Sequence, residues 1–201
     1  MNLAEHYSMA FIVNSPRFTN EGTIYGGLTM GEGRNYLDTR KGYISGKISM
    51  LGGNDTVLGG KRSEYIDGGD GNDTLSGGAG NDKLIGGAGS NTLTGGEGKD
   101  SFIFAVAPLA GNRDIIRDFN PIDDTLKFKQ EAFANIGGKG KLARDALRFG
   151  SMAADAEDRI IYHKSTGNLY YDPDGTGAEA QILIAKLSNK AKLALSDFVV
   201  I

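Results

Sequence analysis

Oxygen-bearing side chains recur at a fixed spacing in the middle of this 201-residue sequence. Each stands at the sixth position of a glycine-rich hexapeptide such as GGDGND or GGAGND. Carboxylate, amide and carbonyl oxygens are the ligands that hard cations of calcium's size prefer. The residues form two series with a spacing of eighteen: Asp55, Asp73 and Asn91 in one, and Glu64, Asp82 and Asp100 in the other.

A nine-residue repeat carries these hexapeptides. Each unit has room for one short strand, centred on a large apolar residue, and one tight glycine-rich turn. Two units, eighteen residues, can close one coil of a flattened right-handed helix with a strand on each side, so that the apolar residues of successive coils stack into a thin core. The apolar residues are Ile48, Val57, Ile66, Leu75, Leu84, Leu93 and Phe102.

The eighteen-residue coil predicts what the turns can bind. Turns two repeats apart lie on the same side of the roll, so their carboxylates face backbone carbonyls of the neighbouring turn. About six oxygen ligands in a flexible cage suit calcium better than magnesium, which demands stricter geometry. Zinc has no cysteine to bind, and His6 and His163 lie outside the repeats. Without a cation, repelling carboxylates, many glycines and a thin core predict a largely disordered segment. The alternative is a flexible Gly/Asp-rich linker, but a linker needs no aliphatic residue at every ninth position.

The composition narrows the class of protein. The formal charge of −3 gives no electrostatic case for nucleic acid or for a membrane surface. The absence of cysteine excludes disulfides, and no apolar run is long enough to span a membrane. The apolar patch at residues 9–13 has no basic segment before it, so we do not expect a Sec-type signal peptide. Sixteen of the 31 glycines fall in residues 51–100, so the middle differs chemically from both flanks.

The expected organisation is an all-β chain with three parts. Residues 1–19 form an N-terminal cap or the stub of a larger protein. Residues 20–103 form a right-handed parallel β-roll, a solenoid of nonapeptide repeats, with irregular coils over 20–50 and regular repeats over 50–103. Residues 104–201 form a mixed, mostly β region that caps the open end of the roll. Strands are expected at 101–106, 114–119, 125–128, 159–162, 168–172, 180–187 and 198–201, and helical turns near 141–147 and 190–195.

The stretch GGDGNDTLSGGAGNDKLIGGAG resembles the RTX (hemolysin-type) calcium-binding nonapeptide repeat, GGxGxDxUx, which forms a parallel β-roll. The region after residue 101, from SFIFAVAP to DFVVI, resembles the C-terminal region of type I secreted bacterial proteins. The resemblance implies a secreted, extracellular protein, exported in one step by the type I secretion machinery with an uncleaved C-terminal signal. The terminal DFVVI is similar to the ends of such signals, and a last β-strand is an equally good interpretation.

The resemblance also implies the ligands. Carboxylates come from Asp55, Asp73, Asp82 and Asp100, and roughly three to five calcium ions are expected. Glu64 follows Lys61 and Arg62, which predicts an incomplete site there, and Asn91 can offer only a neutral carbonyl oxygen to a weaker site. The implied carbonyl ligands occupy the first four positions of the turns: Gly53, Gly68, Gly69, Asp70, Gly71, Gly77, Gly78, Ala79, Gly80, Gly86, Gly87, Ala88, Gly89, Gly95, Gly96, Glu97 and Gly98.

Two further places are candidates outside the regular repeats. Asp118 and Asp124 flank a bend after the roll, where they either close one more calcium site or simply form the turn. Residues 172–177, DPDGTG, resemble part of a calcium loop, but position twelve of such a loop would be Leu183 instead of Glu. We expect a hairpin there, with or without a calcium ion on Asp172 and Asp174.

Three functions remain open. The first is a non-enzymatic calcium-binding module that folds outside the cell and supports secretion and stability of an attached protein. The second is a calcium-dependent polysaccharide- or surface-binding module, whose partner would be an anionic polysaccharide. The third is an enzyme with an unrecognised site in residues 1–50 or 101–201, although the sequence holds no GxSxG, HExxH or Walker A motif. We expect no enzyme, no nucleic-acid partner and no stable membrane insertion.

Overall fold

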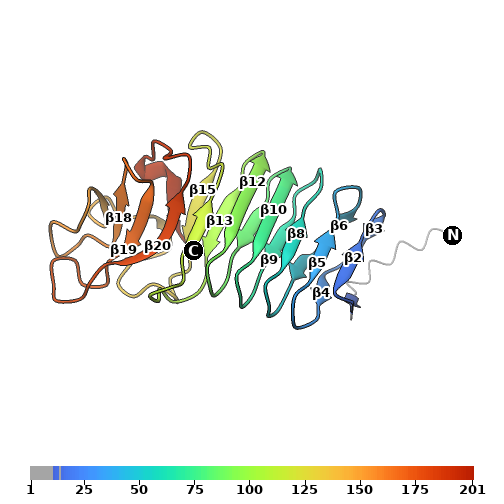
Figure 1. The fold of residues 1–201 in the computed structure, drawn as a ribbon. Helices are drawn as coiled ribbons and strands as arrows, with labels where there is room; N and C mark the ends of the chain where they lie inside the picture. Colours follow the sequence, from blue (N-terminus) through green and yellow to red (C-terminus); the bar gives the residue numbers. More distant parts are fainter. Residues whose placement is uncertain (1–10, 14) are drawn as a thin grey trace.

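The chain forms an elongated stack of short strands, with the N-terminal coils at one end and the C-terminal region at the other (Figure 1). The computed structural model describes residues 11–13 and 15–201. Part of the expected N-terminal cap, residues 1–10 and 14, and His6 with it, lies outside the described residues. Two large sheets face each other along the stack, and a two-stranded sheet, β3 (Thr23–Ile24) and β6 (Tyr43–Ile44), lies beside the first coils.

From β7 to β15, successive strands of the chain alternate between the two large sheets. The nine-stranded sheet has the order β1 (Phe11–Val13), β4 (Leu28–Met30), β7 (Lys47–Ser49), β9 (Tyr65–Asp67), β11 (Lys83–Ile85), β13 (Ser101–Phe104), β15 (Thr125–Phe128), β21 (Phe198–Val200) and β16 (Gly140–Lys141). The ten-stranded sheet has the order β17 (Leu147–Phe149), β18 (Ile160–His163), β19 (Asn168–Tyr171), β20 (Ile182–Leu187), β14 (Asp114–Ile116), β12 (Thr92–Glu97), β10 (Thr74–Ala79), β8 (Thr56–Leu58), β5 (Tyr36–Asp38) and β2 (Arg17–Thr19).

The register of the strands follows the eighteen-residue coil. Leu75 pairs in parallel with Val57 and with Leu93, and Leu84 pairs with Ile66 in the opposite sheet. All five side chains are at most 1% exposed. Successive side chains of a strand point to opposite faces, so one inward residue per strand is enough to fill a core this thin. The prediction of a parallel β-roll is confirmed.

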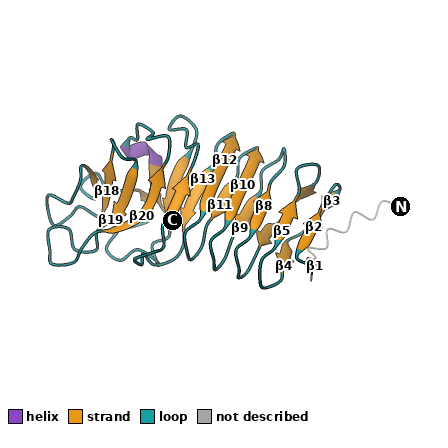
Figure 2. Cartoon of the chain, in the orientation of Figure 1, coloured by secondary structure: helices purple, strands orange, loops and turns teal. Residues whose placement is uncertain are grey.

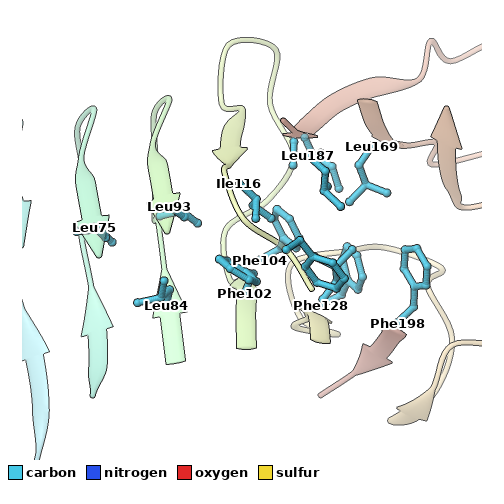
Figure 3. Packing of buried hydrophobic residues seen from close by; sticks show 14 of the residues in the cluster. Leu75, Leu84, Leu93, Phe102, Phe104, Ile116, Phe128, Leu169, Leu187 and Phe198 are labelled. Carbon is cyan, nitrogen blue, oxygen red and sulfur yellow. The ribbon is translucent and has the colours of Figure 1, made fainter. Parts of the chain in front are cut away.

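The core thickens toward the C-terminal end. Aliphatic side chains fill the coils of the repeats, and phenylalanines join them from Phe102 onward (Figure 3). The rings of Phe104 and Phe128 stack with centroids 5.1 Å apart, and Phe128 and Phe198 follow at 6.4 Å. Aromatic side chains each bury a large apolar area, so this end supplies a core that the glycine-rich coils lack.

The sheets continue past residue 103 in mixed orientation. Strands β14, β15, β20 and β21 extend the parallel ladders, whereas β18, β19 and β20 pair antiparallel. The helical turn expected at 141–147 does not form a helix: the segment holds the end of β16, a turn in which the N–H of Ala146 donates to the carbonyl oxygen of Ala143, and the start of β17. The second is displaced to a 3₁₀ helix, η1 (Leu195–Asp197), which is the helical element drawn in Figure 2. Within the described part of the chain, no helix has the length and apolar character needed to cross a membrane.

Candidate metal sites

The sixth-position side chains form two columns, one on each side of the roll. The strands that follow the turns pair in register, so turns eighteen residues apart lie directly on one another. The first column holds Asp55, Asp73 and Asn91, and the second holds Glu64, Asp82 and Asp100. All six residues are at most 2% exposed. The structure therefore brings together the residues that the spacing groups.

One oxygen of each sixth-position aspartate holds the neighbouring turn. Oδ1 of Asp73 accepts the backbone N–H of Asp55 at 2.8 Å, and Oδ1 of Asp82 accepts the N–H of Glu64 at 2.7 Å. The same bond joins Asp100 to the N–H of Asp82 at 2.8 Å. A side chain at the sixth position therefore satisfies a buried donor that would otherwise lack a partner.

The second oxygen of each acidic side chain is buried and has no hydrogen-bond partner. Such an atom is costly in a folded protein unless a cation or a proton compensates it. Five oxygens of this kind lie in the two columns: Oδ2 of Asp55, Asp73, Asp82 and Asp100, and Oε1 of Glu64.

The first glycine of the turn leaves the space that these oxygens face. A Cβ atom at Gly68 would clash with Oδ2 of Asp73 and would lie 2.6 Å from the carbonyl oxygen of Gly86 in the next turn. At Gly77 it would clash with Oδ2 of Asp82 and lie 2.7 Å from the carbonyl oxygen of Gly95. An unpaired carboxylate oxygen and a carbonyl from the adjacent turn thus converge where a side chain is missing. This donor set fits a hard cation such as calcium.

Glycines at the second and fourth positions have a different role. Gly69 and Gly71 adopt φ of +89° and +137°, a region that other residues rarely enter. A Cβ atom at either would also clash with a carbonyl oxygen of the preceding turn, that of Leu51 or Gly53. The first glycine therefore provides room for a ligand, and the other two provide the backbone path of the turn.

Burial also shifts the pKa values of these acids. Burial raises the pKa of Glu64 and Asp82 to about 7 and that of Asp73 to about 6. The same desolvation raises the pKa of Asp55 and Asp100. Desolvation disfavours the charged form of an acid, and a bound cation reverses this effect.

A second ladder, which sequence reasoning missed, runs through the fifth position. Oδ1 of Asn54 accepts the N–H of Asn72 at 2.8 Å, and Oδ1 of Asn72 accepts the N–H of Ser90 at 2.7 Å. On the other side, Asn81 accepts the N–H of Lys99 at 2.8 Å. The signal was present in the sequence, because asparagine precedes the acid in three of the repeats.

The turn at residues 59–64 departs from the others, as its sequence predicts. Neither Gly60 nor Arg62 has the positive φ found at the second and fourth positions of the regular turns. Oε2 of Glu64 folds back to accept the N–H of Gly60 at 3.2 Å. The guanidinium of Arg62 lies over the ring of Tyr43, 4.9 Å from its centroid.

Asp118 and Asp124 close the second column. Asp118 accepts the N–H groups of Gly95 and Gly96 at 2.9 and 2.8 Å, so both of its oxygens are used. Asp124 accepts the N–H groups of Asp100 and Asn120 at 2.9 and 2.8 Å, and its oxygens are also used. Both residues end the turn column through hydrogen bonds, and a closing calcium site at this bend stays a prediction.

The loop after β19 joins antiparallel strands, so the expected hairpin is confirmed. Oδ1 of Asp172 accepts the N–H groups of Asp174 and Gly175, as in a turn-forming aspartate. A calcium ion on Asp172 and Asp174 stays a prediction. Among residues 11–13 and 15–201, no three His, Cys, Asp or Glu side chains group as a metal site, so backbone carbonyls must supply most ligands of any cation in the turns.

Comparison with known proteins identifies the family of the repeat. The RTX calcium-binding nonapeptide repeat (4 copies) matches residues 51–84 and 67–102. The solution structure of the AlgE6R3 subunit of the Azotobacter vinelandii mannuronan C5-epimerase is 32% identical, covers 73% of this chain and 77% of that chain, and has a TM-score of 0.47. The chain belongs to the RTX calcium-binding repeat family. The resemblance seen in the repeats is confirmed, and the repeats of this family bind calcium.

Other comparisons add little to this assignment. The crystal structure of the extracellular lipase LipA from Serratia marcescens is 18% identical and has a TM-score of 0.32. The matched region covers 98% of this RTX chain and 40% of the lipase chain. A search of curated protein sequences gave no match. RTX repeats occur in secreted bacterial proteins, and the repeat region is a structural calcium-binding module.

Proposed function

We propose that this RTX chain is a folding module that is disordered without calcium and becomes a rigid β-roll when calcium binds outside the cell. Its task is to keep a secreted protein unfolded for export and to stabilise it afterwards. Extracellular calcium sites typically have dissociation constants of roughly 10⁻⁴–10⁻³ M, so such sites are empty in the cytosol and filled outside. The five unpaired buried carboxylate oxygens carry the proposal.

The proposed ligands follow from the space beside the first glycine of each turn, which we call the cradle. Oδ2 of Asp73 and the carbonyl of Gly86 bind one ion in the first column, and Oδ2 of Asp82 and the carbonyl of Gly95 bind another in the second. Carbonyls at the second and third positions already accept backbone N–H groups, as Asp70 does from Gly53 at 2.8 Å. Carbonyls at the first position are therefore the better ligands among the turn residues.

Binding energy becomes folding energy in this arrangement. A metal-free roll must bury five carboxylate oxygens without partners, and its glycines lose much conformational freedom on folding. A cation between stacked turns neutralises these oxygens and ties two coils together. Metal ions supply that charge and cross-link when bound, and the chain's own carboxylates and carbonyls determine where they bind.

Far-UV circular dichroism during a calcium titration tests the proposal, with magnesium as the control. We expect a largely disordered spectrum in metal-free buffer and a cooperative gain of β-structure at calcium concentrations of roughly 10⁻⁴–10⁻³ M. Magnesium should have little effect in the same range. A spectrum that is already β-rich without metal, and that calcium leaves unchanged, contradicts the folding switch.

The export part of the proposal places the type I secretion signal at the C-terminus. Residues 104–201 would cap the roll, and their last strand, β21, lies between β15 and β16 with Phe198 fully buried. A buried signal is accessible to an exporter only while the chain is unfolded, which fits export before calcium binding. Export from bacteria with and without a type I exporter, using the full chain and a chain lacking residues 197–201, tests this. Equal export of both chains contradicts it.

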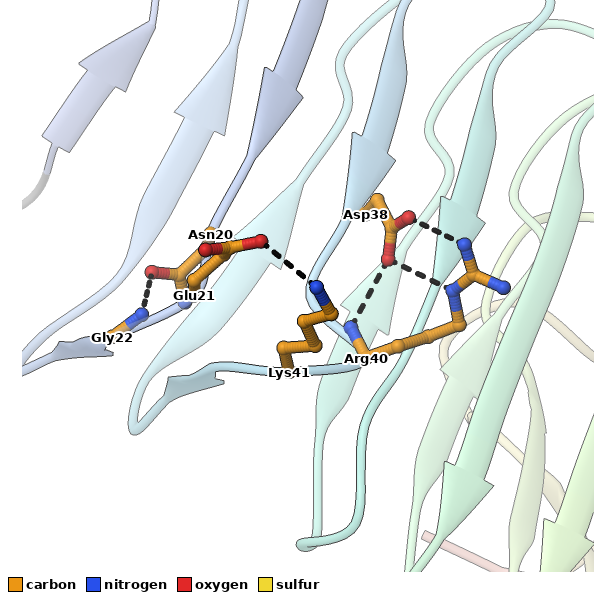
Figure 4. A network of polar contacts seen from close by, with 6 residues as sticks. All are labelled: Asn20, Glu21, Gly22, Asp38, Arg40 and Lys41. Carbon is orange, nitrogen blue, oxygen red and sulfur yellow. Dashed lines mark hydrogen bonds and ion pairs between the residues drawn. The ribbon is translucent and has the colours of Figure 1, made fainter.

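A cationic groove favours a second function, calcium-dependent binding of an anionic polysaccharide. The groove lies beside the N-terminal coils and has a volume of about 490 Å³. Lys41 pairs with Glu21 at 3.2 Å, and Arg40 binds Asp38 at 2.7 Å (Figure 4). Glu21 is the acidic residue that lines the groove, and it is outnumbered by the basic residues Arg40, Lys41, Lys61 and Arg62.

Binding of polyuronate, measured by calorimetry in calcium, separates this function from the first. We expect polyuronate to bind, a neutral glucan not to bind, and the double variant Lys61→Ala/Arg62→Ala to lose most of the affinity. The exposed Lys192→Ala is the matched control and should behave as the wild type. Equal affinity of the double variant and the wild type contradicts the groove as the binding surface.

A further inference from the structure

The turn at residues 86–91 ends the first column without an unpaired oxygen. Asn91 replaces the acid there, and its Nδ2 donates to Oδ1 of Asp114 at 2.9 Å. Nδ2 lies 2.6 Å from the position that a Cβ atom of Gly86 would take. In turn 68–73, Oδ2 of Asp73 lies at the equivalent place beside Gly68. Asp114, twenty-three residues after Asn91, lies beside the same place, with its two oxygens 2.9 and 3.0 Å from the Cβ position of Gly86.

The orientation of the Asn91 amide is fixed by its neighbours. Oδ1 of Asn91 accepts the backbone N–H of Asp73 at 2.9 Å. Exchanging the two ends of the amide would bring Nδ2 against that N–H and Oδ1 against the carboxylate of Asp114, so both bonds would be lost. The oxygen of Asn91 is thus already used, and an NH₂ group faces the cradle. The expectation that Asn91 offers its carbonyl oxygen to a calcium ion does not agree with this geometry.

The opposite end of the same column shows an independent case. Asn35 stands at the sixth position of turn 30–35, and its backbone N–H donates to Oδ1 of Asp55 at 2.7 Å. Its Nδ2 donates to the carbonyl oxygens of Gly31 and Gly33 at 2.6 and 2.7 Å. These are carbonyls of the turn itself, at its second and fourth positions. Asn35 is 4% exposed, so the amide is enclosed within the turn.

We infer that side-chain amides stand in for calcium at both ends of the first column. Asn35 and Asn91 place NH₂ donors where the intervening Asp55 and Asp73 present unpaired oxygens. The first column therefore binds calcium through the carboxylates of Asp55 and Asp73, and the asparagines of its two terminal turns hold no ion of their own. This inference rests on the proposed calcium binding and deepens it, because it assigns which sixth-position side chains bind ions and which do not.

The side-chain amides of Asn35 and Asn91, which we call the amide plugs, also explain how the first column can end. A cation needs oxygen ligands from two stacked turns, and the turn beyond residue 91 is irregular, with Asp114 five residues later than the repeat predicts. A neutral amide satisfies the buried carboxylate of Asp114 through one charge-assisted hydrogen bond. An aspartate at position 91 would instead face Asp114 with a second negative charge and would need a cation between them.

Counting bound ions by isothermal titration calorimetry tests the inference. Relative to the wild type, we expect Asn91→Asp and Asn35→Asp each to bind one additional calcium ion per chain. Asp73→Asn, the reverse exchange in the same column, should bind one ion fewer. Asp114→Asn should leave the number unchanged, because Asp114 contacts an amide and no ion.

Each outcome separates the inference from the function on which it rests. If Asn91→Asp and Asn35→Asp bind as many ions as the wild type while Asp73→Asn loses one, calcium binding stands and the amide plugs are wrong. If Asn91→Asp does not fold, Asp114→Asn decides, since loss of one ion there makes Asp114 a ligand and overturns the inference. A wild-type chain that binds no calcium contradicts the proposed function and this inference together.

Discussion

The two oxygens of each sixth-position carboxylate have separate roles. In Asp82, Oδ1 accepts the N–H of Glu64 at 2.7 Å, whereas Oδ2 is buried without a partner beside Gly77. The first oxygen organises the backbone of the stack, and the second is available to calcium. An asparagine preserves the first role and removes the second, and Asn91 shows that the fold accepts this exchange.

We predict that Asp82→Asn binds one calcium ion fewer and raises the calcium midpoint of folding at least tenfold, since loss even of a residue that supports a metal ligand costs 10- to 100-fold. The introduced amide would keep the bond to Glu64 and place an NH₂ group in the cradle. Calorimetry and circular dichroism measure the two effects. Asp70→Asn is the matched control, because the Asp70 side chain is exposed in the same kind of turn. An unchanged ion number in Asp82→Asn contradicts the ligand assignment.

At the scale of the strand, stability depends on one inward residue per nine. Leu84 is fully buried and pairs with Ile66 on one side and Phe102 on the other. A solenoid coil contacts only its neighbours, so few other residues can fill a cavity there. We predict that Leu84→Ala lowers the free energy of unfolding in saturating calcium by about 2–5 kcal/mol.

Urea denaturation in saturating calcium measures that loss. Ile122→Ala is the control, since Ile122 is 87% exposed and its truncation should change stability by less than about 0.5 kcal/mol. The calcium ligands are untouched in both variants, so the number of bound ions should stay that of the wild type. Equal stability of the two variants would mean that the stacked leucines do not hold the coils together.

The sequence was most informative where the repeat is regular. A nine-residue period specifies both the apolar residue of each strand and the acid of each turn, so Leu75, Leu84 and the two columns were predictable. Asp114 was missed because the irregular loop at 105–113 breaks the spacing of eighteen. The helical turn expected at 141–147 follows local propensity, but Lys141 pairs with Val199 and Leu147 with Ile160, so tertiary pairing overrode it.

At the scale of the whole molecule, the roll combines a metal-dependent middle with a metal-independent end. The phenylalanines around Phe128 form an apolar core that needs no cation. The coils between residues 50 and 103 bury carboxylate oxygens instead. Calcium-free solution should therefore unfold the repeats first, and any condition that neutralises the carboxylates should restore them in part.

Protons provide such a condition. Burial raises the pKa of Glu64 and Asp82 to about 7 and of Asp73 to about 6 in the folded chain, whereas unfolded carboxyl groups have pKa values of about 4. Between pH 8 and 5 the folded chain therefore binds more protons than the unfolded chain, so its metal-free stability rises as the pH falls. Asp38, whose pKa is lowered to about 2 beside Arg40, acts in the opposite direction only below about pH 4.

We predict that metal-free chain gains β-structure in circular dichroism as the pH falls from 8 to 5, whereas calcium binds more weakly over the same range because protons compete for the same oxygens. Buffers stripped of metal by resin avoid the pH dependence of chelators. The triple variant Asp73→Asn/Asp82→Asn/Asp100→Asn is the control, and its metal-free spectrum should depend much less on pH. A wild-type chain that loses β-structure on acidification would show that these buried carboxylates do not limit the folding of the metal-free roll.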